Sequence, residues 1–542
     1  MLQAFDADTF FAGGRPPGLP ADAPAPDENS LFARAIELSL ASSRYPLEAL
    51  RDILERENRR IGASDAALDA IRSIGAGTVF VVAGQQAGLF GGPLYTIYKA
   101  VHAVRLAGRI HEKTGVNAVP VFWTASDDHD FAEVGGVGVR TSDGAPFRVE
   151  YSPRSRVEGA PVGEIALDSG IEAAIDALAG HLIPGERAGS YIGLLRRAWT
   201  PGTRWSDAFS AQISALLSRR GLVMLDPRWE GVKVLFAAIM RAELERPLAS
   251  SALVNEEADR LESGYARKAA IRRPEGATSL FLETGGVRRI VRYDGRAYHA
   301  GEERLTQGEI LGLLEAGPGR FSPGAALRAV CQDALMPVAA LVAGPGERAY
   351  LDQVRPLYRL FGVNGSLVWP RASFTLLDRR SLRAAGKAGI PVRSIFLGMD
   401  SVRGEIALAS FPAELSRALD ALDWATDSGF DDVAGALDKL DPTLSKSVRT
   451  EKGRVLHSIL GIRERAIRAH KARLEIADSR LAAAAHFLLP DRQPQERWFG
   501  ADSVFILLGP EGLDELLALA SPGEEKHRML VDAEGSSPGE KE

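Results

Sequence analysis

The sequence predicts an α/β protein whose core is a parallel β-sheet, followed by a domain of long helices. Residues 78–83 form a continuous apolar run, which is typical of a buried parallel strand. A glycine-rich turn, a segment with helical periodicity and a second apolar run at 118–124 follow it. This order of strand, helix and strand indicates a βαβ unit. Residues 443–486 hold few glycines and prolines and are rich in Arg, Lys, Glu and Ala, which favours long helices.

The remaining core is predicted to repeat this alternation and to carry one insertion. Residues 279–299 alternate between apolar and polar side chains and contain Asp294-Gly295, which is a hairpin signal. We therefore expect a small β-rich insertion at about residues 240–320. Residues 31–60 are expected to form a helix. Further core strands are expected at residues 221–227, 338–343 and 367–370.

The helical domain and the two ends complete the predicted organisation. Apolar residues within 443–486 recur at spacings of three, four and seven. A helix of about 40 residues is about 60 Å long, so we expect it to protrude and to pair with a partner helix. An extended arm at 11–29 and a disordered charged tail after residue 524 are also expected. The predicted domains are a core with its arm and insertion at 1–376, a helical coiled-coil domain at 377–496, and a return to the core with the tail at 497–542.

Composition limits the function classes. Of the 542 residues, 45% are hydrophobic and 25% are charged, and the net charge is −6, as in an ordinary soluble globular protein. The chain has no basic excess for nucleic acid, no secretory signal, and no apolar run near the roughly 20 residues that cross a bilayer. Cys331 is the only cysteine, which excludes an internal disulfide and a zinc site of several thiolates. We therefore expect a cytoplasmic protein without nucleic-acid or membrane partners.

The turn between the first strand and its helix is the first candidate site. Glycines let the backbone approach a ligand, and amides at the start of the helix after Pro93 would attract phosphate or carboxylate. Lys99 would reach this turn only if its side chain curled back towards it. The alternative is a structural turn, since the pattern fits neither the dinucleotide fingerprint nor the P-loop. The candidate binding residues here are Gly84, Gln85, Gln86, Gly88, Gly91, Gly92 and Lys99.

An acidic cluster just past the second strand is the other main candidate. Ligands of open α/β sheets bind at this edge, and the carboxylates repel one another unless something positive lies among them. A bound cation such as Mg²⁺, a substrate ammonium group or an arginine would serve. His129 is a candidate general base. The alternative is a solvated acidic loop capped by His129. The candidates are Asp127, Asp128, His129, Asp130 and Glu133.

Two further groups complete the candidate site. The turn Gly344-Pro-Gly346 again lies between a strand and a helix, with Glu347 at the helix start and Tyr350 one turn on. Glu347 is electrostatically favoured at a helix start even without a ligand. Arg328 is suited to clamp a carboxylate in bidentate fashion, although a surface ion pair is the alternative. Cys331 is expected to be inert packing.

These blocks resemble one known family. Residues 82–99 and 119–133 are similar to the signature blocks of the bacillithiol biosynthesis cysteine-adding enzymes, also called cysteine ligases. Tyr95, Trp123 and Gln332 lie within matching blocks and join the expected binding residues. The blocks extend in order over nearly the whole chain. The other matching blocks are residues 221–227, 321–333, 343–350, 370–378 and 487–497.

The resemblance implies a fold, a reaction and partners. It implies a Rossmann-like core, related to nucleotidylyltransferases and class I synthetases, and a coiled-coil domain that supports a homodimer. The implied reaction joins the L-cysteine carboxyl to the amine of glucosaminyl-malate, the last step of bacillithiol synthesis. ATP is the expected co-substrate, because an amide does not form from a free carboxylate without activation. The HxGH and KMSKS signatures of the related enzymes are not visible, so adenylyl and phosphoryl activation both remain open.

Two other functions remain alternatives at this stage. One is a nucleotidylyltransferase that acts on another small molecule. The other is a scaffold protein in which the long helix is the working part and the core has lost activity. The intact glycine and acidic blocks argue against the scaffold.

Overall fold

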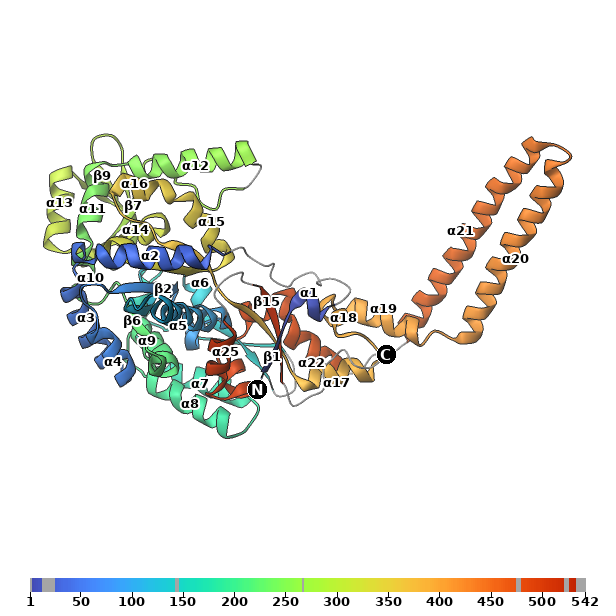
Figure 1. The fold of residues 1–542 in the computed structure, drawn as a ribbon, viewed down its shortest axis with the longest axis horizontal. Coiled ribbons are helices and arrows are strands. Elements are labelled where there is room, and N and C mark those ends of the chain that lie inside the picture. Colours follow the sequence, from blue (N-terminus) through green and yellow to red (C-terminus); the bar gives the residue numbers. More distant parts are fainter. Residues whose placement is uncertain are drawn as a thin grey trace. The chain divides into compact units, whose positions relative to one another are not determined.

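The computed structural model describes residues 2–11, 25–141, 146–265, 268–473, 479–520 and 526–532. These residues form two compact units (Figure 1). One contains residues 25–376 and 493–532 together with the N-terminal strand, and the other contains residues 377–492. No helix among the residues given above is long and apolar enough to cross a membrane.

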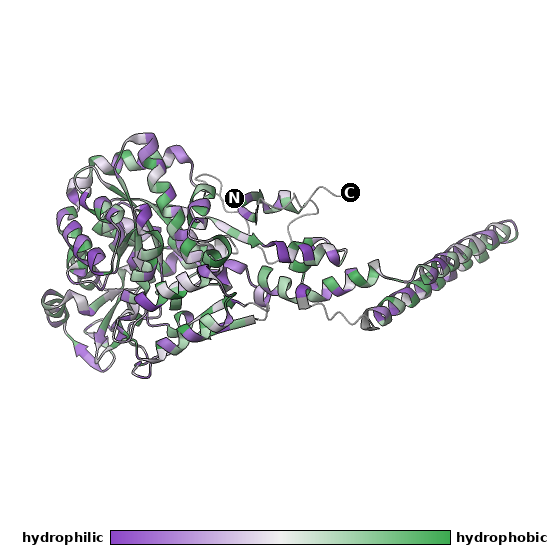
Figure 2. Cartoon of the chain, turned by 90° about the horizontal axis from the view of Figure 1, so that it is seen from below, coloured by the Kyte–Doolittle hydropathy of each residue, from purple (hydrophilic) through white to green (hydrophobic). Residues whose placement is uncertain are grey.

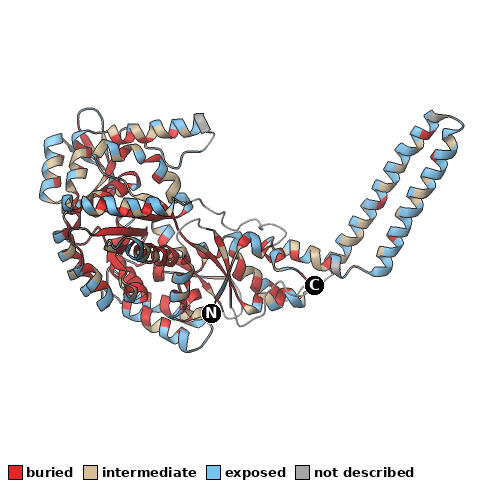
Figure 3. Ribbon diagram, in the orientation of Figure 1, coloured by how far each residue is buried: buried red, intermediate tan, exposed pale blue. Residues whose placement is uncertain are grey.

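The first unit is organised around a five-stranded parallel sheet, as the apolar runs predict. The order of its strands is β13-β12-β2-β3-β6. Neighbouring strands are parallel throughout, and the strands are buried (Figure 3). This is the predicted Rossmann-like arrangement. The strands are β2 (Val79–Gln85), β3 (Ala118–Thr124), β6 (Val223–Leu225), β12 (Val338–Ala343) and β13 (Leu367–Pro370).

The pairing register brings the candidate turns together at one edge. Gly84 on β2 lies opposite Trp123 on β3, and Gln85 lies opposite Thr124. Helix α5 (Leu94–Thr114) connects β2 to β3 and ends at Gly115, which adopts φ 71° and is therefore suited to a helix C-terminus. Because parallel strands end at the same edge, the turns after β2, β3 and β12 are neighbours.

The predicted helix at 31–60 is wrong as a single element. The structure has two helices, α2 (Glu28–Leu40) and α3 (Leu47–Arg60), separated by a short 3-10 turn. Tyr45 is extended, with ψ 149°, because the residue before a proline is sterically excluded from the helical region. Asp27 caps α2 by accepting a hydrogen bond from the Ser30 amide.

Within the region of the predicted β-rich insertion, the structure has an antiparallel sheet in the order β10-β9-β8-β7-β11. The Asp294 side chain accepts hydrogen bonds from the amides of Arg296 and Ala297, as expected for the hairpin turn. The strands are β7 (Ala277–Thr284), β8 (Val287–Tyr293), β9 (Tyr298–Ala300), β10 (Glu303–Leu305) and β11 (Phe321–Pro323). Helices α11 (Ala237–Glu245), α12 (Ala249–Tyr265), α13 (Gln307–Ala316) and α14 (Ala325–Leu335) accompany it.

A third sheet joins the two chain ends. Its order is β1-β15-β14, with β1 at Leu2–Asp6, β14 at Ser373–Leu377 and β15 at His527–Asp532. The expected disorder after residue 524 is therefore wrong for β15, whose Met529 and Leu530 are buried. Pairing with a strand at the opposite end of the chain leaves no trace in local composition. Most of the predicted arm at 11–29 lies outside the described residues.

The second unit is helical, with a long antiparallel pair. Helix α20 (Ala413–Asp438) packs along α21 (Pro442–Arg473). The predicted helix at 443–486 is divided between α21 and α22 (Ser479–Leu488), and Ile476 falls outside the described residues. The partner of the long helix is thus α20 of the same chain. The pair mixes apolar and polar residues along its length (Figure 2), and most of its residues are exposed (Figure 3).

Candidate active site

A cavity of about 580 Å³ lies at the carboxyl ends of β2, β3 and β12. Its wall combines the turns after these strands with the β insertion and α14. Most of the residues singled out in the sequence line it. They are Gly84, Gln85, Gln86, Tyr95, Lys99, Trp123, Asp127, Asp128, His129, Glu133, Arg328, Gly344, Gly346, Glu347 and Tyr350. The cavity wall does not include Gly88, Gly91, Gly92, Asp130 or Gln332.

The start of α5 is not the anion site that the sequence predicts. The Leu94 amide donates to the carbonyl of Phe499 at 2.7 Å, and the Gly92 amide donates to the carbonyl of Leu89 at 3.0 Å. These amides are therefore unavailable to a ligand. The later glycines have a packing role instead, because a Cβ on Gly88 would lie 2.6 Å from Gly92 Cα.

Replacing Gly88 with alanine is expected to destabilise the first unit by about 1–3 kcal/mol, because the turn must shift to admit the methyl group. Thermal melting and urea unfolding measure this loss. Gly108→Ala is the matched control, since no neighbouring atom lies within 4 Å of the added Cβ within α5. It should gain about 0.5–1 kcal/mol from helix propensity. A Gly88→Ala chain that unfolds like the wild type would contradict the packing role.

Lys99 reaches back from α5 to tie two turns together. Its ammonium donates to the Gly84 carbonyl at 2.9 Å and to Gln85 Oε1 at 2.8 Å, and it forms an ion pair with Glu347. Glu347 also accepts a hydrogen bond from the Gly344 amide at 2.9 Å. Burial raises the pKa of Glu347, but the Lys99 ammonium holds it below its ordinary value. Lys99 and Glu347 therefore fix the turns after β2 and β12 relative to each other.

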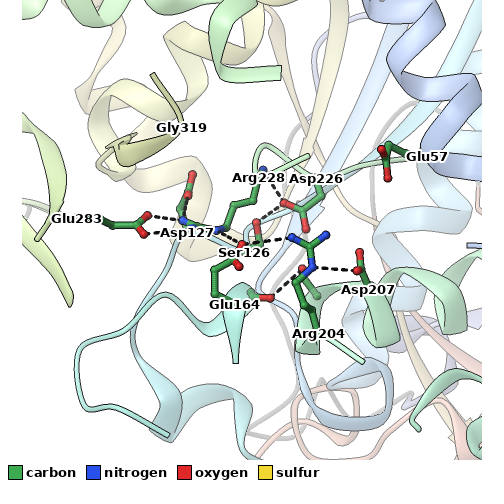
Figure 4. Close-up of polar contacts among 12 residues, drawn as sticks. Glu57, Ser126, Asp127, Glu164, Arg204, Asp207, Asp226, Arg228, Glu283 and Gly319 are labelled. Carbon is green, nitrogen blue, oxygen red and sulfur yellow. Dashed lines mark hydrogen bonds and ion pairs between the residues drawn. The ribbon is translucent and has the colours of Figure 1, made fainter. Parts of the chain in front are cut away.

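Asp127 has its positive partners within the chain. Its Oδ1 lies 2.7 Å from Lys233 Nζ and 2.9 Å from Arg228 Nη1. Arg228 also pairs with Glu283 on β7 and with Glu164 (Figure 4). Burial raises the pKa of Asp127, but the two cations outweigh it and lower the pKa. This network fastens the β insertion to the end of β3, so Asp127 is a structural residue at the cavity wall.

Asp128 is oriented by neutral donors. Gln86 Nε2 donates to its Oδ2 at 2.6 Å, and the His129 amide donates to its Oδ1 at 2.8 Å. Burial raises the pKa of Asp128, but these hydrogen bonds and the charge of Arg288 hold it below its ordinary value. No lysine or arginine of the described residues forms an ion pair with it. Its side chain is 38% exposed, so this ionised carboxylate remains open to a cation from outside the chain.

His129 faces an arginine. Its Nδ1 lies 3.3 Å from Arg288 Nη1. A guanidinium can only donate, so in this contact Nδ1 is the acceptor and Nε2 is the ring nitrogen that carries a proton. The imidazole therefore offers a donor, and the expectation that it acts as a general base does not fit this arrangement.

Glu133 is the neighbouring carboxyl group of the cavity wall. Burial and the charges of Asp128 and Asp130 raise its pKa, while a hydrogen bond from Gln86 acts to lower it.

Four arginines of the cavity wall, Arg273, Arg288, Arg328 and Arg497, form no ion pair with a carboxylate among the residues that the structure describes. Arg288 on β8 donates to Ser322 Oγ at 2.9 Å and stacks 3.7 Å above the Phe281 ring. Arg328 on α14 donates to Tyr350 Oη at 2.9 Å. The Arg273 guanidinium donates to the Thr278 carbonyl. Burial lowers the pKa of Arg273 and Arg288. Guanidinium groups without a carboxylate partner indicate an anionic ligand.

Comparison with known proteins decides the family. Residues 24–372 match the N-terminal Rossmann-like domain of the bacillithiol biosynthesis BshC family, and residues 374–531 match its C-terminal coiled-coil domain. The chain belongs to the BshC family. Each of its relatives in Salinibacter ruber, Koribacter versatilis and Thermus thermophilus is named "Putative cysteine ligase BshC".

The similarity to these BshC relatives extends over most of each chain. The Salinibacter protein is 30% identical over 493 residues, which cover 89% of this chain and 88% of the relative. The Koribacter protein is 30% identical over 475 residues, with 87% of each chain covered. The Thermus protein is 32% identical over 456 residues, with 83% of this chain and 87% of the relative covered.

Several residues that line this BshC-family cavity, or that pair with its lining residues, could not be identified from the sequence. Arg273 precedes β7 and Arg288 lies on β8, each next to another arginine in the sequence, and nothing local distinguishes them from surface residues. Arg228 and Lys233 follow β6 and meet Asp127 only in the folded chain. No local motif marks any of the four. Repulsion within the acidic block was the one available signal, since it implies nearby cations.

The described residues of this BshC-family cavity do not form a metal site from protein side chains alone. In the described parts of the chain, no three His, Cys, Asp or Glu side chains are placed to hold a metal ion. Asp127 is already committed to two cations. We therefore assign no chemical step to a metal held by these residues.

Proposed function

We propose that this chain is a cysteine ligase that joins the L-cysteine carboxyl to the amine of glucosaminyl-malate, with ATP as the activating co-substrate. Family membership and the names of the relatives support the proposal. The observation that carries it is that a single cavity contains both arginines without carboxylate partners and an oriented carboxylate, Asp128, that forms no ion pair with a lysine or arginine of the described residues. Such a cavity matches substrates that bring anions and an amine to one place.

The anionic groups of the substrates explain why the cavity wall carries arginines without carboxylate partners. Malate contributes two carboxylates, the cysteine substrate one more, and ATP its phosphates. Guanidinium groups bind such planar or tetrahedral anions through paired hydrogen bonds. Arg273, Arg288 and Arg328 lack a carboxylate among the described residues, and a bound anion removes the cost of burying them unpaired. We assign the malate and acyl-donor carboxylates to these arginines.

The amine of the acceptor substrate explains the role that we assign to Asp128. As an ionised carboxylate oriented by Gln86, it binds the substrate ammonium and accepts one of its protons, so that the neutral amine attacks the activated carboxyl; the second proton leaves the nitrogen with the departing AMP or phosphate. Glu133 lies on the same cavity wall and adds a second carboxyl group. His129 presents Nε2–H and therefore serves as a donor to substrate oxygen.

Activation requires a leaving group on the cysteine carboxyl. In one route the carboxylate attacks the α-phosphorus of ATP and releases pyrophosphate. In the other it attacks the γ-phosphorus and releases ADP. The amine then forms the C–N bond while the C–O bond to AMP or phosphate breaks.

Reconstitution tests the proposal directly. Purified chain is incubated with glucosaminyl-malate, L-cysteine and ATP, and the thiol product is followed by mass spectrometry. Chromatography of the nucleotides distinguishes AMP from ADP and so separates the two routes. Product that depends on all three substrates is the expected result. The absence of product at substrate concentrations that saturate binding would refute the assignment.

We also propose that the α20–α21 pair joins two copies of the chain. Leu422, Trp424 and Val433 on α20 are 46%, 73% and 51% exposed, and burial in a second copy removes this apolar surface from water. Light scattering after size exclusion should give twice the 58.1 kDa mass of the chain. Trp424→Glu should shift the mass towards that of a monomer. A wild-type chain that runs as a monomer would contradict the dimer.

A further inference from the structure

Arg273 and Arg288 bring two like charges close together in the cavity wall. Both side chains line the cavity, and neither forms an ion pair with a carboxylate among the described residues. Arg288 is only 9% exposed. Burial lowers the pKa of Arg273, Glu243 opposes this effect, and the like charge of Arg288 adds to it. Two desolvated guanidinium groups that repel each other indicate that an anion binds between them.

Glu243 is the carboxylate that acts on Arg273 from within the protein. It is 1% exposed, and its Oε1 accepts hydrogen bonds from the Ser279 amide and from Ser250 Oγ, each at 2.7 Å. Neither its Oε2 nor Arg273 Nε has a hydrogen-bond partner among the described residues. Burial raises the pKa of Glu243, which weakens its compensation of the positive charge. The guanidinium of Arg273 therefore remains available to a ligand.

The start of α14 lies against the same two arginines. Arg288 Nη2 donates to the Pro323 carbonyl at 3.1 Å. A Cβ built on Gly324 would lie 3.9 Å from Arg273 Nη1. Pro323, Gly324 and Ala325 all line the cavity, so the guanidinium of Arg273 reaches the cavity wall beside this helix. The positive end of the helix dipole adds to the two guanidinium charges.

Arg288 connects this pair to the carboxylate that we assign to the amine. Its Nη1 lies 3.3 Å from Nδ1 of His129, which is the residue next to Asp128. Against the effect of burial, the charge of Arg288 helps to lower the pKa of Asp128. Arg328 differs, since against the effect of burial its charge helps to lower the pKa of Glu347 after β12. Arg288 is therefore the arginine on the side of Asp128, and Arg328 lies on the side of Glu347.

The acceptor substrate carries its amine and its carboxylates close together. In glucosamine the carbon that bears the amine adjoins the anomeric carbon, through which a glycoside is joined to malate. When the amine lies on Asp128, the malate must therefore lie near Asp128 as well. Arg497 also lines the cavity, but it is exposed to solvent and needs no ligand to remain charged. Arg273 and Arg288 are the more deeply buried of these groups and gain most from a bound anion.

We propose that Arg273 and Arg288, beside the start of α14, form the subsite that binds the malate carboxylates and thereby selects acidic glycosides of glucosamine as acceptors. The proposal rests on the proposed ligase function. Arg288 stacks on Phe281 at 3.7 Å and bonds His129, which fixes its plane and leaves further N–H donors for a ligand. Two guanidinium groups match a dicarboxylate through paired hydrogen bonds. An acceptor without malate leaves both charges unpaired in the cavity, so it binds more weakly.

Kinetics of Arg273→Gln with two acceptors provide the first test. Loss of a hydrogen bond between charged groups should raise the KM for glucosaminyl-malate by about 10- to 100-fold. The KM values for L-cysteine and ATP should stay unchanged. Methyl glucosaminide has the amine but no malate, so its kcat/KM should be the same in the variant and in the wild type. A structural role of Arg273 would instead lower the rates with both acceptors. Arg273→Lys keeps the charge and should recover part of the discrimination.

Neighbouring arginines supply matched controls. Arg272 and Arg289 are exposed and lie outside the cavity wall, and Arg272 pairs with Asp259 and Glu262. Arg272→Gln and Arg289→Gln should therefore discriminate between the two acceptors as the wild type does. Arg328→Gln should also retain this discrimination, because Arg328 lies on the side of Glu347. Unchanged discrimination in Arg273→Gln, or its loss in Arg328→Gln alone, would overturn the proposal.

Calorimetric titration gives a readout that does not depend on activity. The full chain is titrated with glucosaminyl-malate or with methyl glucosaminide, without L-cysteine and ATP. The wild type should bind glucosaminyl-malate about 10- to 100-fold more tightly than methyl glucosaminide, and Arg273→Gln and Arg288→Gln should each reduce this difference. Equal affinities of the wild type for the two compounds would overturn the proposal. Failure of the ligase function would instead show as absence of product when the wild-type chain receives all three substrates.

Discussion

Asp128→Asn is expected to lower the rate of product formation by about 10²- to 10³-fold and to leave the fold intact. Asparagine keeps an oxygen that accepts the Gln86 hydrogen bond, so the turns after β2 and β3 stay joined. It lacks the negative charge that binds the substrate ammonium and accepts its proton. Steady-state kinetics of the thiol product, together with thermal melting, measure both effects.

Asp130→Asn is the matched control for this prediction. Asp130 belongs to the same acidic block but is exposed and lies outside the cavity wall. Its replacement should leave turnover within about twofold of the wild type, as for a surface residue without a partner. Equal losses in the two variants would show that the block acts through its total charge. Full activity of Asp128→Asn would exclude the assigned role.

Asp127→Asn is expected to act on stability, at a cost of about 3–5 kcal/mol in the free energy of unfolding. The carboxylate is buried against Lys233 and Arg228, so its neutral replacement leaves Lys233, which is 3% exposed, without its negative partner. The link from β3 to Glu283 of the insertion also weakens. Urea unfolding monitored by tryptophan fluorescence measures the loss.

The loss should depend on pH in a defined direction. The folded-state pKa of Asp127 is held below its unfolded value by Lys233 and Arg228, against the effect of burial. The stabilisation is therefore fully present above about pH 4, which is the unfolded pKa of an aspartate. It is lost as pH falls through the folded value. Wild type and Asp127→Asn should thus converge in stability at acidic pH.

Asp176→Asn controls for the removal of an ion pair. Asp176 pairs with Arg196 on the surface, where both side chains are more than 60% exposed. Such exposed pairs contribute about 0–1 kcal/mol, so the variant should unfold almost as the wild type does. An Asp127→Asn variant as stable as this control, at neutral pH, would contradict the network around Asp127.

The parallel core and the two main turns could be predicted from the sequence because their signals are local. The apolar runs of β2 and β3 predict buried strands from their local sequence alone, and Gly115 marks the end of α5. Strands of one parallel sheet end at a common edge, so the meeting of Gln86 with Asp128 followed from the order of elements. In the structure Gln86 Nε2 donates a hydrogen bond to Asp128 Oδ2 at 2.6 Å, as this order of elements predicts.

The remainder of the site depends on pairings between distant segments. The amides at the start of α5 look free in sequence, but the Phe499 carbonyl occupies one of them. Arg228 and Lys233 neutralise Asp127, whereas the sequence left a metal, an ammonium group and an arginine as alternatives. Arg288 fixes the tautomer of His129 from a different sheet. Such contacts arise from tertiary packing, which residue periodicity does not encode.

The most direct test of the account is a crystal structure of the chain with glucosaminyl-malate bound. The account predicts that the ligand occupies the cavity at the ends of β2, β3 and β12, with its amine on Asp128. Its malate carboxylates should contact at least one of Arg273, Arg288 and Arg328. A ligand bound in another part of the chain, or bound here with its amine directed away from Asp128, would contradict the account.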